Sequence, residues 1–252
     1  MARRSAPLVA DAPPADDQRF PPISLRDVRA GYGRIEILHG IDVDVRRGAV
    51  TALLGPNGAG KTTTLGVMSG LLTPTAGCRH VEGRHLNRAG AEELARIGIC
   101  HIREGRSVFP NLSVADNLVV AASSGAPVER IQDVAYTLFP RLKERHKQLA
   151  GTLSGGEKQM LALARGLGTD PAVLLVDELS MGLAPIVVDK LYESVAAIAA
   201  GGVSVLVVEQ FATIGLRVAD HVYVMAHGAI TYGGPADGAM DAVHHAYLGS
   251  DG

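Results

Sequence analysis

The most constraining feature of this 252-residue sequence is a glycine-rich loop between an apolar run and a helical pattern. The loop reads Gly55-Pro56-Asn57-Gly58-Ala59-Gly60-Lys61-Thr62. It fits the pattern G-x-x-x-x-G-K-[ST]. Residues 50–54 before it are typical of a short buried strand, and apolar residues recur at helical spacing over residues 62–72. A strand, a glycine loop and a helix in this order are the context that a phosphate-binding loop requires.

The residue types of this loop are those that phosphate binding needs. The glycines let backbone N–H groups approach phosphate oxygens, Lys61 can reach the β- and γ-phosphates, and Thr62 can offer its hydroxyl to Mg²⁺. The following helix adds the positive end of its dipole. A plain glycine-rich turn would not require both flanking elements, so we interpret the loop as a phosphate-binding loop. We therefore expect ATP and Mg²⁺ as cofactors. The candidate nucleotide-binding residues here are Gly55, Asn57, Gly58, Ala59, Gly60, Lys61, Thr62 and Thr63.

Two acidic residues follow a second apolar run at residues 173–176. A carboxylate at the carboxyl end of a buried strand can hold Mg²⁺, which is the role we expect for Asp177. The next acid, Glu178, can position the attacking water while Lys61 and the metal stabilise the charge of phosphoryl transfer. An Asp-Glu pair after a strand is by itself an ordinary loop start. The phosphate loop makes this pair a catalytic candidate.

A third motif lies between these two and narrows the family. It reads Leu153-Ser154-Gly155-Gly156-Glu157-Lys158-Gln159. Ser154 is a favoured helix N-cap, two glycines expose backbone N–H groups, and Glu157 lies in the first turn, so this helix start can bind an anion. The motif resembles the LSGGEQQ signature of ABC ATPases, with Lys158 where Gln is common. In that family the signature contacts the γ-phosphate of ATP held by the other subunit, so the resemblance implies a dimer with two sandwiched ATP molecules.

The resemblance extends over about residues 23–249 and implies a fold. That fold is an α/β P-loop NTPase core of the ABC ATPase type, with an antiparallel β subdomain and an α-helical subdomain inserted at about residues 113–165. Residues 23–252 would form this ATPase domain. Residues 1–22 are rich in Ala and Pro, and we interpret them as a disordered extension.

Other positions take expected roles from the same resemblance. Tyr32 matches the aromatic residue that stacks on adenine. Glu104 stands where most members have a Gln that contacts Mg²⁺ and water, and Gln210 stands where most have the switch His. The expected catalytic residues are Glu178, Lys61 and Gln210, and the expected metal ligands are Thr62, Glu104 and Asp177.

Several of these features are similar to one lineage, the second ATPase subunit of branched-chain (hydrophobic) amino-acid importers. They are Glu104, Gln210, Gly182-Leu183-Ala184-Pro185 and Ala246-Tyr247-Leu248-Gly249. The resemblance implies a subunit that hydrolyses ATP to power a membrane importer. Two alternatives stay open: an importer of urea or another small amide, and a low-turnover nucleotide-binding regulator. Leu179, Arg103 and Phe211 depart even from this lineage and leave the rate of turnover open.

Composition limits the partners. No apolar run approaches the roughly 18–20 residues of a membrane-spanning helix, so a membrane role requires separate permease subunits. The net charge is −2 without a basic stripe, which argues against nucleic acid and against ABC ATPases that act on DNA or ribosomes. By resemblance we expect a second ATPase subunit, identical or related, an extracytoplasmic substrate-binding protein, and a peripheral location on the cytoplasmic face of the membrane. The permease would dock near residues 104–113.

Patterns elsewhere predict the remaining elements. Strands are expected at residues 23–28, 41–45 and 203–208, a hairpin at 222–232, and helices from a capping box at Ser113 and Asp116 to about residue 165. Gly166 and Gly168 fall inside an expected helix, where each costs up to about 1 kcal/mol relative to Ala. The two cysteines and nine histidines show no ligand spacing, so we expect them to be packing or surface residues.

Overall fold

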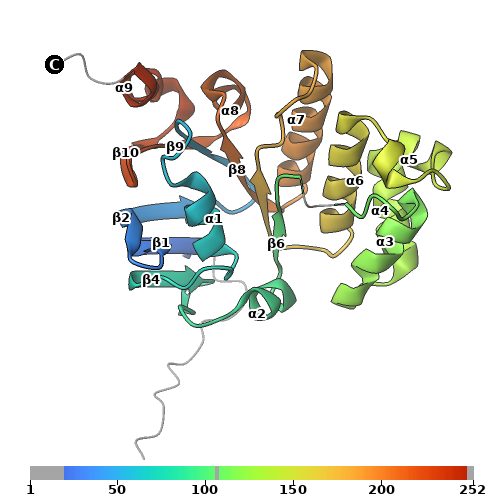
Figure 1. Ribbon diagram of the computed structural model, residues 1–252, viewed down its shortest axis with the longest axis horizontal. Coiled ribbons are helices and arrows are strands. Elements are labelled where there is room, and N and C mark those ends of the chain that lie inside the picture. The colour runs from blue at the N-terminus through green and yellow to red at the C-terminus, as the bar shows by residue number, and fades with distance from the viewer. Residues whose placement is uncertain (1–19, 106–107, 249–252) are drawn as a thin grey trace, which may run out of the picture.

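Two β-sheets and a group of helices make up the fold (Figure 1). The structure is a computed structural model that describes residues 20–105 and 108–248, so residues 1–19 of the expected extension lie outside the described residues. The first sheet is antiparallel, with the order β2 (Ile35–Val45), β1 (Ile23–Tyr32), β4 (Ala76–Val81) and β5 (Arg84–His85). The second has the order β10 (Ala229–Gly234), β9 (His221–Ala226), β3 (Val50–Leu54), β8 (Ser204–Glu209), β7 (Val173–Asp177) and β6 (Ile99–Ile102).

Helices α3 to α6 follow one another between β6 and β7, and the other helices alternate with strands along the chain. The α-helices are α1 Lys61–Met68, α2 Ala91–Arg96, α3 Val114–Ala121, α4 Val128–Leu138, α5 Pro140–Glu144, α6 Gly155–Leu167, α7 Pro185–Ala200, α8 Ala212–Val218 and α9 Met240–Leu248. Short 3₁₀ turns lie at Ala122–Ser124, Ala150–Thr152 and Ala236–Gly238. Among the described residues, none of the helices combines the length and the apolar character needed to span a bilayer.

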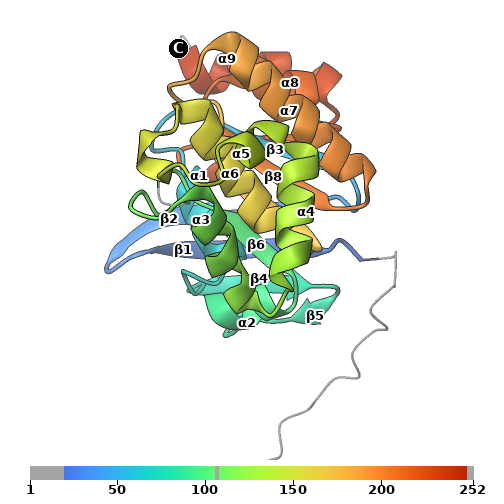
Figure 2. The same ribbon diagram turned by 90° about the vertical axis from the view of Figure 1, so that its right-hand side faces the viewer.

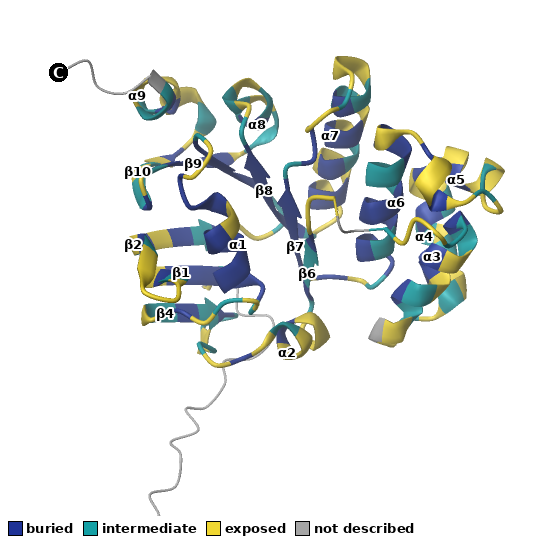
Figure 3. Cartoon of the chain, in the orientation of Figure 1, coloured by how far each residue is buried: buried dark blue, intermediate teal, exposed yellow. Residues whose placement is uncertain are grey.

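The second sheet is parallel from β6 to β9, and its central strands are buried on both faces. Every residue of β3, β7 and β8 is buried, which confirms the expectation from their continuous apolar runs (Figure 3). Successive side chains of a strand point to opposite faces. Leu174 and Val176 therefore pack in the core with α6 and α7, while Val173 and Leu175 pack in the core with α1. The antiparallel sheet contributes to the α1 core.

Helices α3 to α6 gather at one side of the molecule, in front of the sheets in Figure 2. The predicted capping box is present at the start of α3, where Asp116 N–H donates to Ser113 Oγ at 3.0 Å. One turn further, the buried Asn117 holds the preceding loop: its Oδ1 accepts from Phe109 N–H at 2.8 Å, and its Nδ2 donates to Phe109 O at 3.0 Å. The loop at residues 109–113 is therefore fixed to the helical group rather than to the sheets.

Three predicted boundaries or costs are corrected by the structure. The helix expected over residues 62–72 ends at Met68, because Gly70 adopts a φ of 74° and Leu72 N–H turns back to Gly66 O at 2.9 Å. The strand expected from residue 203 runs from Ser204 to Glu209. Gly168 is not merely a poor helix former, because a Cβ there would lie 2.7 Å from a carbon of Ile131 on α4. Close contact between α6 and α4 requires glycine at this position.

Candidate functional site

The predicted phosphate loop connects β3 to α1 at the carboxyl edge of the parallel sheet. Lys61, the first residue of α1, is 5% exposed, and its ammonium group donates to Gly55 O at 2.8 Å and to Pro56 O at 3.1 Å. Burial lowers the pKa of Lys61, and the charges of Glu178 and Asp177 oppose that shift. The lysine ammonium therefore lies against the loop carbonyls, and the charges of both acids favour its protonated form.

The loop also fits closely against the end of β9. A Cβ at Gly55 would lie 2.3 Å from Met225 O, so any residue with a side chain would clash with the β9 backbone here. Gly228 N–H, in the β9–β10 turn, donates to Ala59 O at 2.9 Å. Thr62 is exposed on the outer side of the loop, whereas Thr63 is buried. A loop supported in this way presents its N–H groups in a fixed arrangement, as phosphate binding requires.

Asp177 ends β7, and its carboxylate is placed for a cation. The residue is 7% exposed, and its Oδ1 has no hydrogen-bond partner in the described structure. Burial raises its pKa to about 6, helped by the charges of Glu178 and Glu104 and opposed by Lys61. A buried carboxylate oxygen without a partner is costly unless a ligand satisfies it. The Asp177 carboxylate therefore fits a hard divalent cation such as Mg²⁺, which prefers oxygen ligands.

Glu178 follows Asp177 with a backbone φ of 47°, which is uncommon outside glycine. Its N–H donates to Val208 O at 3.0 Å, so the adjacent strand β8 holds this conformation. Burial raises the pKa of the half-buried Glu178 carboxyl, the Glu104 charge raises it further, and Lys61 opposes the shift. The chain therefore turns sharply here, and the charges of Lys61 and Glu104 both influence the Glu178 carboxyl.

A buried carboxylate that the sequence prediction missed lies beside this pair. Glu209 is 1% exposed at the end of β8 and accepts from Ser180 N–H at 3.1 Å and from Ser180 Oγ at 2.7 Å. The hydroxyl of Tyr192 on α7 also donates to it. The cluster ties the loop after Glu178 to β8 and α7. Its signal in the sequence was the same as for Asp177, an acid ending a buried strand.

Gln210 comes next, and its backbone is linked to the phosphate loop through the last helix. The hydroxyl of Tyr247 on α9 donates to Gln210 O at 2.6 Å and accepts from Gly55 N–H at 3.0 Å. Burial raises the pKa of Tyr247 to about 12, so this hydroxyl stays protonated and can serve as both donor and acceptor. The sequence analysis named Tyr247 only as part of a terminal motif that resembles one lineage and predicted no role for it. The structure gives it a place in the site.

The signature motif forms the start of α6 as a capped helix. Ser154 is the N-cap and Glu157 completes a capping box, with the Glu157 carboxylate accepting from Ser154 N–H at 3.0 Å and from Ser154 Oγ at 2.9 Å. Arg145 Nε lies 3.2 Å from the same carboxylate. The Glu157 carboxylate is therefore occupied by hydrogen bonds to Ser154, while Ser154 and Gly155 remain exposed at the start of the helix.

The structure brings some predicted site residues together and keeps others apart. Asp177 and Glu178 lie at one sheet edge, where the charges of Lys61 and Glu104 shift the pKa of both acids in opposite directions. The start of α6 belongs to the other core, and in Figure 3 α1 and α6 lie on opposite sides of β7 and β8. Tyr32 is 56% exposed where β1 ends, in the antiparallel sheet.

The residues that depart from the lineage occupy different environments. Leu179 is fully buried in the core shared by α6 and α7, which accounts for an apolar side chain there. Phe211, the N-cap residue of α8, is 54% exposed, and Arg103 is exposed after β6. Nothing in the structure explains the last two substitutions.

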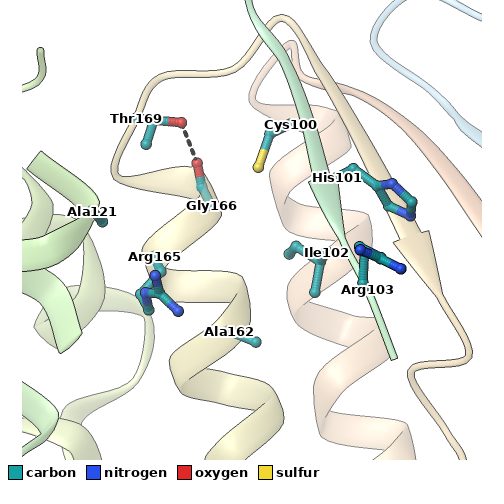
Figure 4. A pocket seen from close by; sticks show the side chains of 9 residues that line it. All are labelled: Cys100, His101, Ile102, Arg103, Ala121, Ala162, Arg165, Gly166 and Thr169. Carbon is teal, nitrogen blue, oxygen red and sulfur yellow. Dashed lines mark hydrogen bonds between the residues drawn. The ribbon is translucent and has the colours of Figure 1, made fainter. Parts of the chain in front are cut away.

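A cavity of about 260 Å³ opens between β6 and α6. Figure 4 shows Cys100, His101 and Arg103 on the β6 side and Arg165 on the α6 side. The guanidinium of Arg165 also lies over the ring of Phe109, 4.8 Å from its centroid. The hollow therefore adjoins the loop that carries the expected docking residues, not the phosphate loop.

Comparisons with known proteins agree with this geometry. The ABC transporter family matches residues 38–180. The chain is 39% identical over 231 residues to the high-affinity branched-chain amino acid transport ATP-binding protein BraG of Pseudomonas aeruginosa, which covers 90% of this chain and 99% of the relative. It is 33% identical over 223 residues to the probable branched-chain amino acid transport ATP-binding protein LivF of Archaeoglobus fulgidus, which covers 86% of this chain and 94% of the relative.

Solved structures have the same fold. The crystal structure of the ADP conformation of an ATP-binding cassette of an ABC transporter is similar, with a TM-score of 0.81 and 25% identity. The similarity covers 90% of this chain and 98% of that cassette. The α/β class with an antiparallel sheet, a parallel sheet and helices is therefore confirmed.

Proposed function

Because the chain belongs to the ABC transporter family and is an ATP-hydrolysing subunit that powers transport, we propose that it hydrolyses MgATP to drive import of branched-chain amino acids. One observation carries the chemical part: the buried Asp177 carboxylate, with an unpartnered oxygen, lies at the same sheet edge as Lys61 and Glu178. A lysine, a metal-binding carboxylate and a second acid are the groups that phosphoryl transfer to water needs.

Each residue then has a role that its environment supports. The phosphate loop binds the triphosphate, and Lys61 leaves its two loop carbonyls to contact phosphate oxygens. Thr62, Asp177 and Glu104 would hold Mg²⁺, which supplies charge stabilisation when bound. Glu178 accepts a proton from, or orients, the attacking water, and Gln210 contacts the same region from the end of β8. Tyr32 stacks on the adenine.

A second chain completes the site in this proposal. ABC ATP-binding subunits dimerise, and the two anion-binding helix starts of this chain serve opposite faces of its parallel sheet. One triphosphate therefore contacts the α1 start of one protomer and Ser154, Gly155 and Gly156 of its partner. Glu157 acts indirectly, because its carboxylate is occupied by the cap. The partner is a second copy or a related ATPase.

Two substitutions test the chemistry. Glu178→Gln should slow ATP hydrolysis by orders of magnitude and leave ATP binding intact, because the phosphate loop is unchanged. Lys61→Ala should weaken binding of a fluorescent ATP analogue. Glu193→Gln, an exposed acid on α7, is the matched control and should hydrolyse ATP at the wild-type rate. Wild-type turnover in Glu178→Gln would show that the water is positioned by another group.

The named relatives support branched-chain amino acids as the transported substrate, since both carry that substrate class in their names. The test is to purify the chain with its permease and binding protein and to identify the ligand that the binding protein retains. Leucine, isoleucine or valine is the expected result. Urea or another small amide would replace the proposed substrate while leaving the ATPase assignment intact.

Subunits of this family work with membrane permease components, and we propose that the permease docks near residues 104–113, of which residues 106–107 lie outside the described residues. Phe109 is 45% exposed there on a loop that Asn117 holds rigidly to α3. Phe109→Asp or Leu112→Asp should abolish uptake in membrane vesicles and keep basal ATPase activity. Normal uptake in both variants would exclude this surface. Docking there would place the chain on the cytoplasmic face of the membrane.

A further inference from the structure

Three metal-ligating side chains meet in the antiparallel sheet, in a place that ATP hydrolysis does not use. Cys78 and His80 lie on β4, and His85 lies on β5. One ligand atom of each, the Cys78 sulfur and a ring nitrogen of each histidine, lies within 4.8 Å of the others. The sequence patterns predicted packing or surface roles for the cysteines and histidines and gave no sign that three of them lie this close together.

Strand geometry explains why the three side chains converge. Cys78 and His80 are two residues apart on β4, so they project from the same face of the sheet. The tight β4–β5 hairpin pairs His80 directly with His85, and their ring centroids lie 5.5 Å apart. The intervening residue Arg79 points the other way, is fully buried, and donates to Val67 O at the end of α1.

The three ligands therefore face away from α1 and from the phosphate loop. This orientation, and their position in the antiparallel sheet, separates them from the nucleotide-binding residues at the edge of the parallel sheet. Cys78 and His80 are half-buried and His85 is exposed, so the cluster is open to solvent on one side. An ion could reach it without any change in the core.

We propose that Cys78, His80 and His85 bind a borderline first-row metal ion, Zn²⁺, with a fourth coordination position open to water. One thiolate and two imidazoles are ligands that Zn²⁺ accepts in tetrahedral sites. Zn–S and Zn–N bonds of about 2.3 and 2.0–2.1 Å put the ligand atoms about 3.3–3.6 Å apart. The ligand atoms lie within 4.8 Å of one another, so side-chain rotations that bring them closer by about 1.2–1.5 Å at most reach this value.

The charges around the cluster are compatible with a cation. Burial lowers the pKa of His80, and the neighbouring His85 and Arg26 lower it further, which favours the neutral imidazole that metal ligation uses. Arg26 lies opposite Cys78 in the β1–β4 register, and its guanidinium is paired with Asp44 at 2.6 Å. Metal binding replaces the thiol proton of Cys78, which is released to solvent.

The test uses the untagged, nucleotide-free full chain and Co²⁺ as a spectroscopic substitute for Zn²⁺. Titration with Co²⁺ should produce a thiolate-to-cobalt charge-transfer band that Zn²⁺ then removes. Cys78→Ser should abolish the band, and His85→Ala should weaken Zn²⁺ binding by more than about ten-fold. Cys100→Ser, which removes the half-buried thiol of β6 with a pKa raised to about 11 by burial, is the control and should retain the band.

Thermal unfolding supplies an independent measurement, because a ligand that binds the folded state raises the unfolding midpoint. Zn²⁺ should raise the midpoint of the wild type and of Cys100→Ser, and should not raise that of Cys78→Ser or His85→Ala. His85 is exposed, so its substitution leaves the fold intact. Absence of the cobalt band in the wild type, or an undiminished band in Cys78→Ser, would overturn the proposed site.

Discussion

Removing one hydroxyl group, in Tyr247→Phe, tests how the last helix supports the nucleotide site. In the wild type this oxygen accepts from Gly55 N–H at 3.0 Å and donates to Gln210 O at 2.6 Å. The phenylalanine ring fills the same space without either hydrogen bond. The change therefore separates the polar link between α9, the phosphate loop and the β8 end from the packing of the ring.

The magnitude follows from the burial of the two partners. Gly55 is buried, so its N–H is left without an acceptor, which costs about 1–3 kcal/mol. Gln210 is half-buried and its carbonyl can turn to water, which limits that loss to about 0.5–1 kcal/mol. We expect a total decrease of about 1.5–4 kcal/mol in the free energy of unfolding, or a midpoint lower by about 3–16 °C for a chain of this size.

Urea unfolding of the nucleotide-free protein measures this loss, with an unchanged m-value as the sign that only stability has changed. Tyr232→Phe is the matched control, because that hydroxyl makes one exposed hydrogen bond to Pro235 O at 2.7 Å. The control should lose less than about 1 kcal/mol. If the two variants unfold within about 0.5 kcal/mol of each other, the hydroxyl of Tyr247 does not bridge the loops.

Three further changes test the packing and the charges around the site. Burial and the charge of Arg103 lower the pKa of His101 to about 4, below its ordinary 6.5, so stability is lost as the pH falls from 6.5 toward 4. Between pH 7 and pH 4, His101→Leu should therefore lose about 1–3 kcal/mol less unfolding free energy than the wild type, as measured by urea unfolding at both pH values. An equal loss in both proteins would contradict this. Gly168→Ala should destabilise by about 1–3 kcal/mol despite better helix propensity, because the added carbon would lie 2.7 Å from an isoleucine of α4. Gly66→Ala is its control, since the added carbon meets nothing closer than 3.6 Å, and thermal unfolding should show no loss; a stabilised Gly168→Ala would refute the packing argument. Glu209→Ala leaves three hydrogen-bond donors without their acceptor and should cost about 3 kcal/mol or more in urea unfolding, and a loss below about 1 kcal/mol would show that the donors find other partners.

Local patterns predicted the elements of this fold because their causes are local. Continuous apolar runs identified β3 and β7, and side-chain capping chemistry identified the start of α3. The misjudged features depend on neighbours that the sequence does not place. Gly168 is explained by Ile131 on a different helix, and Glu209 by hydroxyl groups of Ser180 and Tyr192.

The sequence by itself determined the phosphate loop, the acids at the end of β7 and the capped signature helix, because each depends on residue types at short, fixed spacing. Only the tertiary structure decided which of them act together. Parallel pairing of β3, β8 and β7 brings the phosphate loop and the acids to one edge, and the alternation of side chains along β7 assigns α1 and α6 to different cores. The same pairing rules, in the β4–β5 hairpin, place Cys78 and His80 beside His85. Contacts between strands depend on register and sheet order, which a periodic pattern within one strand does not contain.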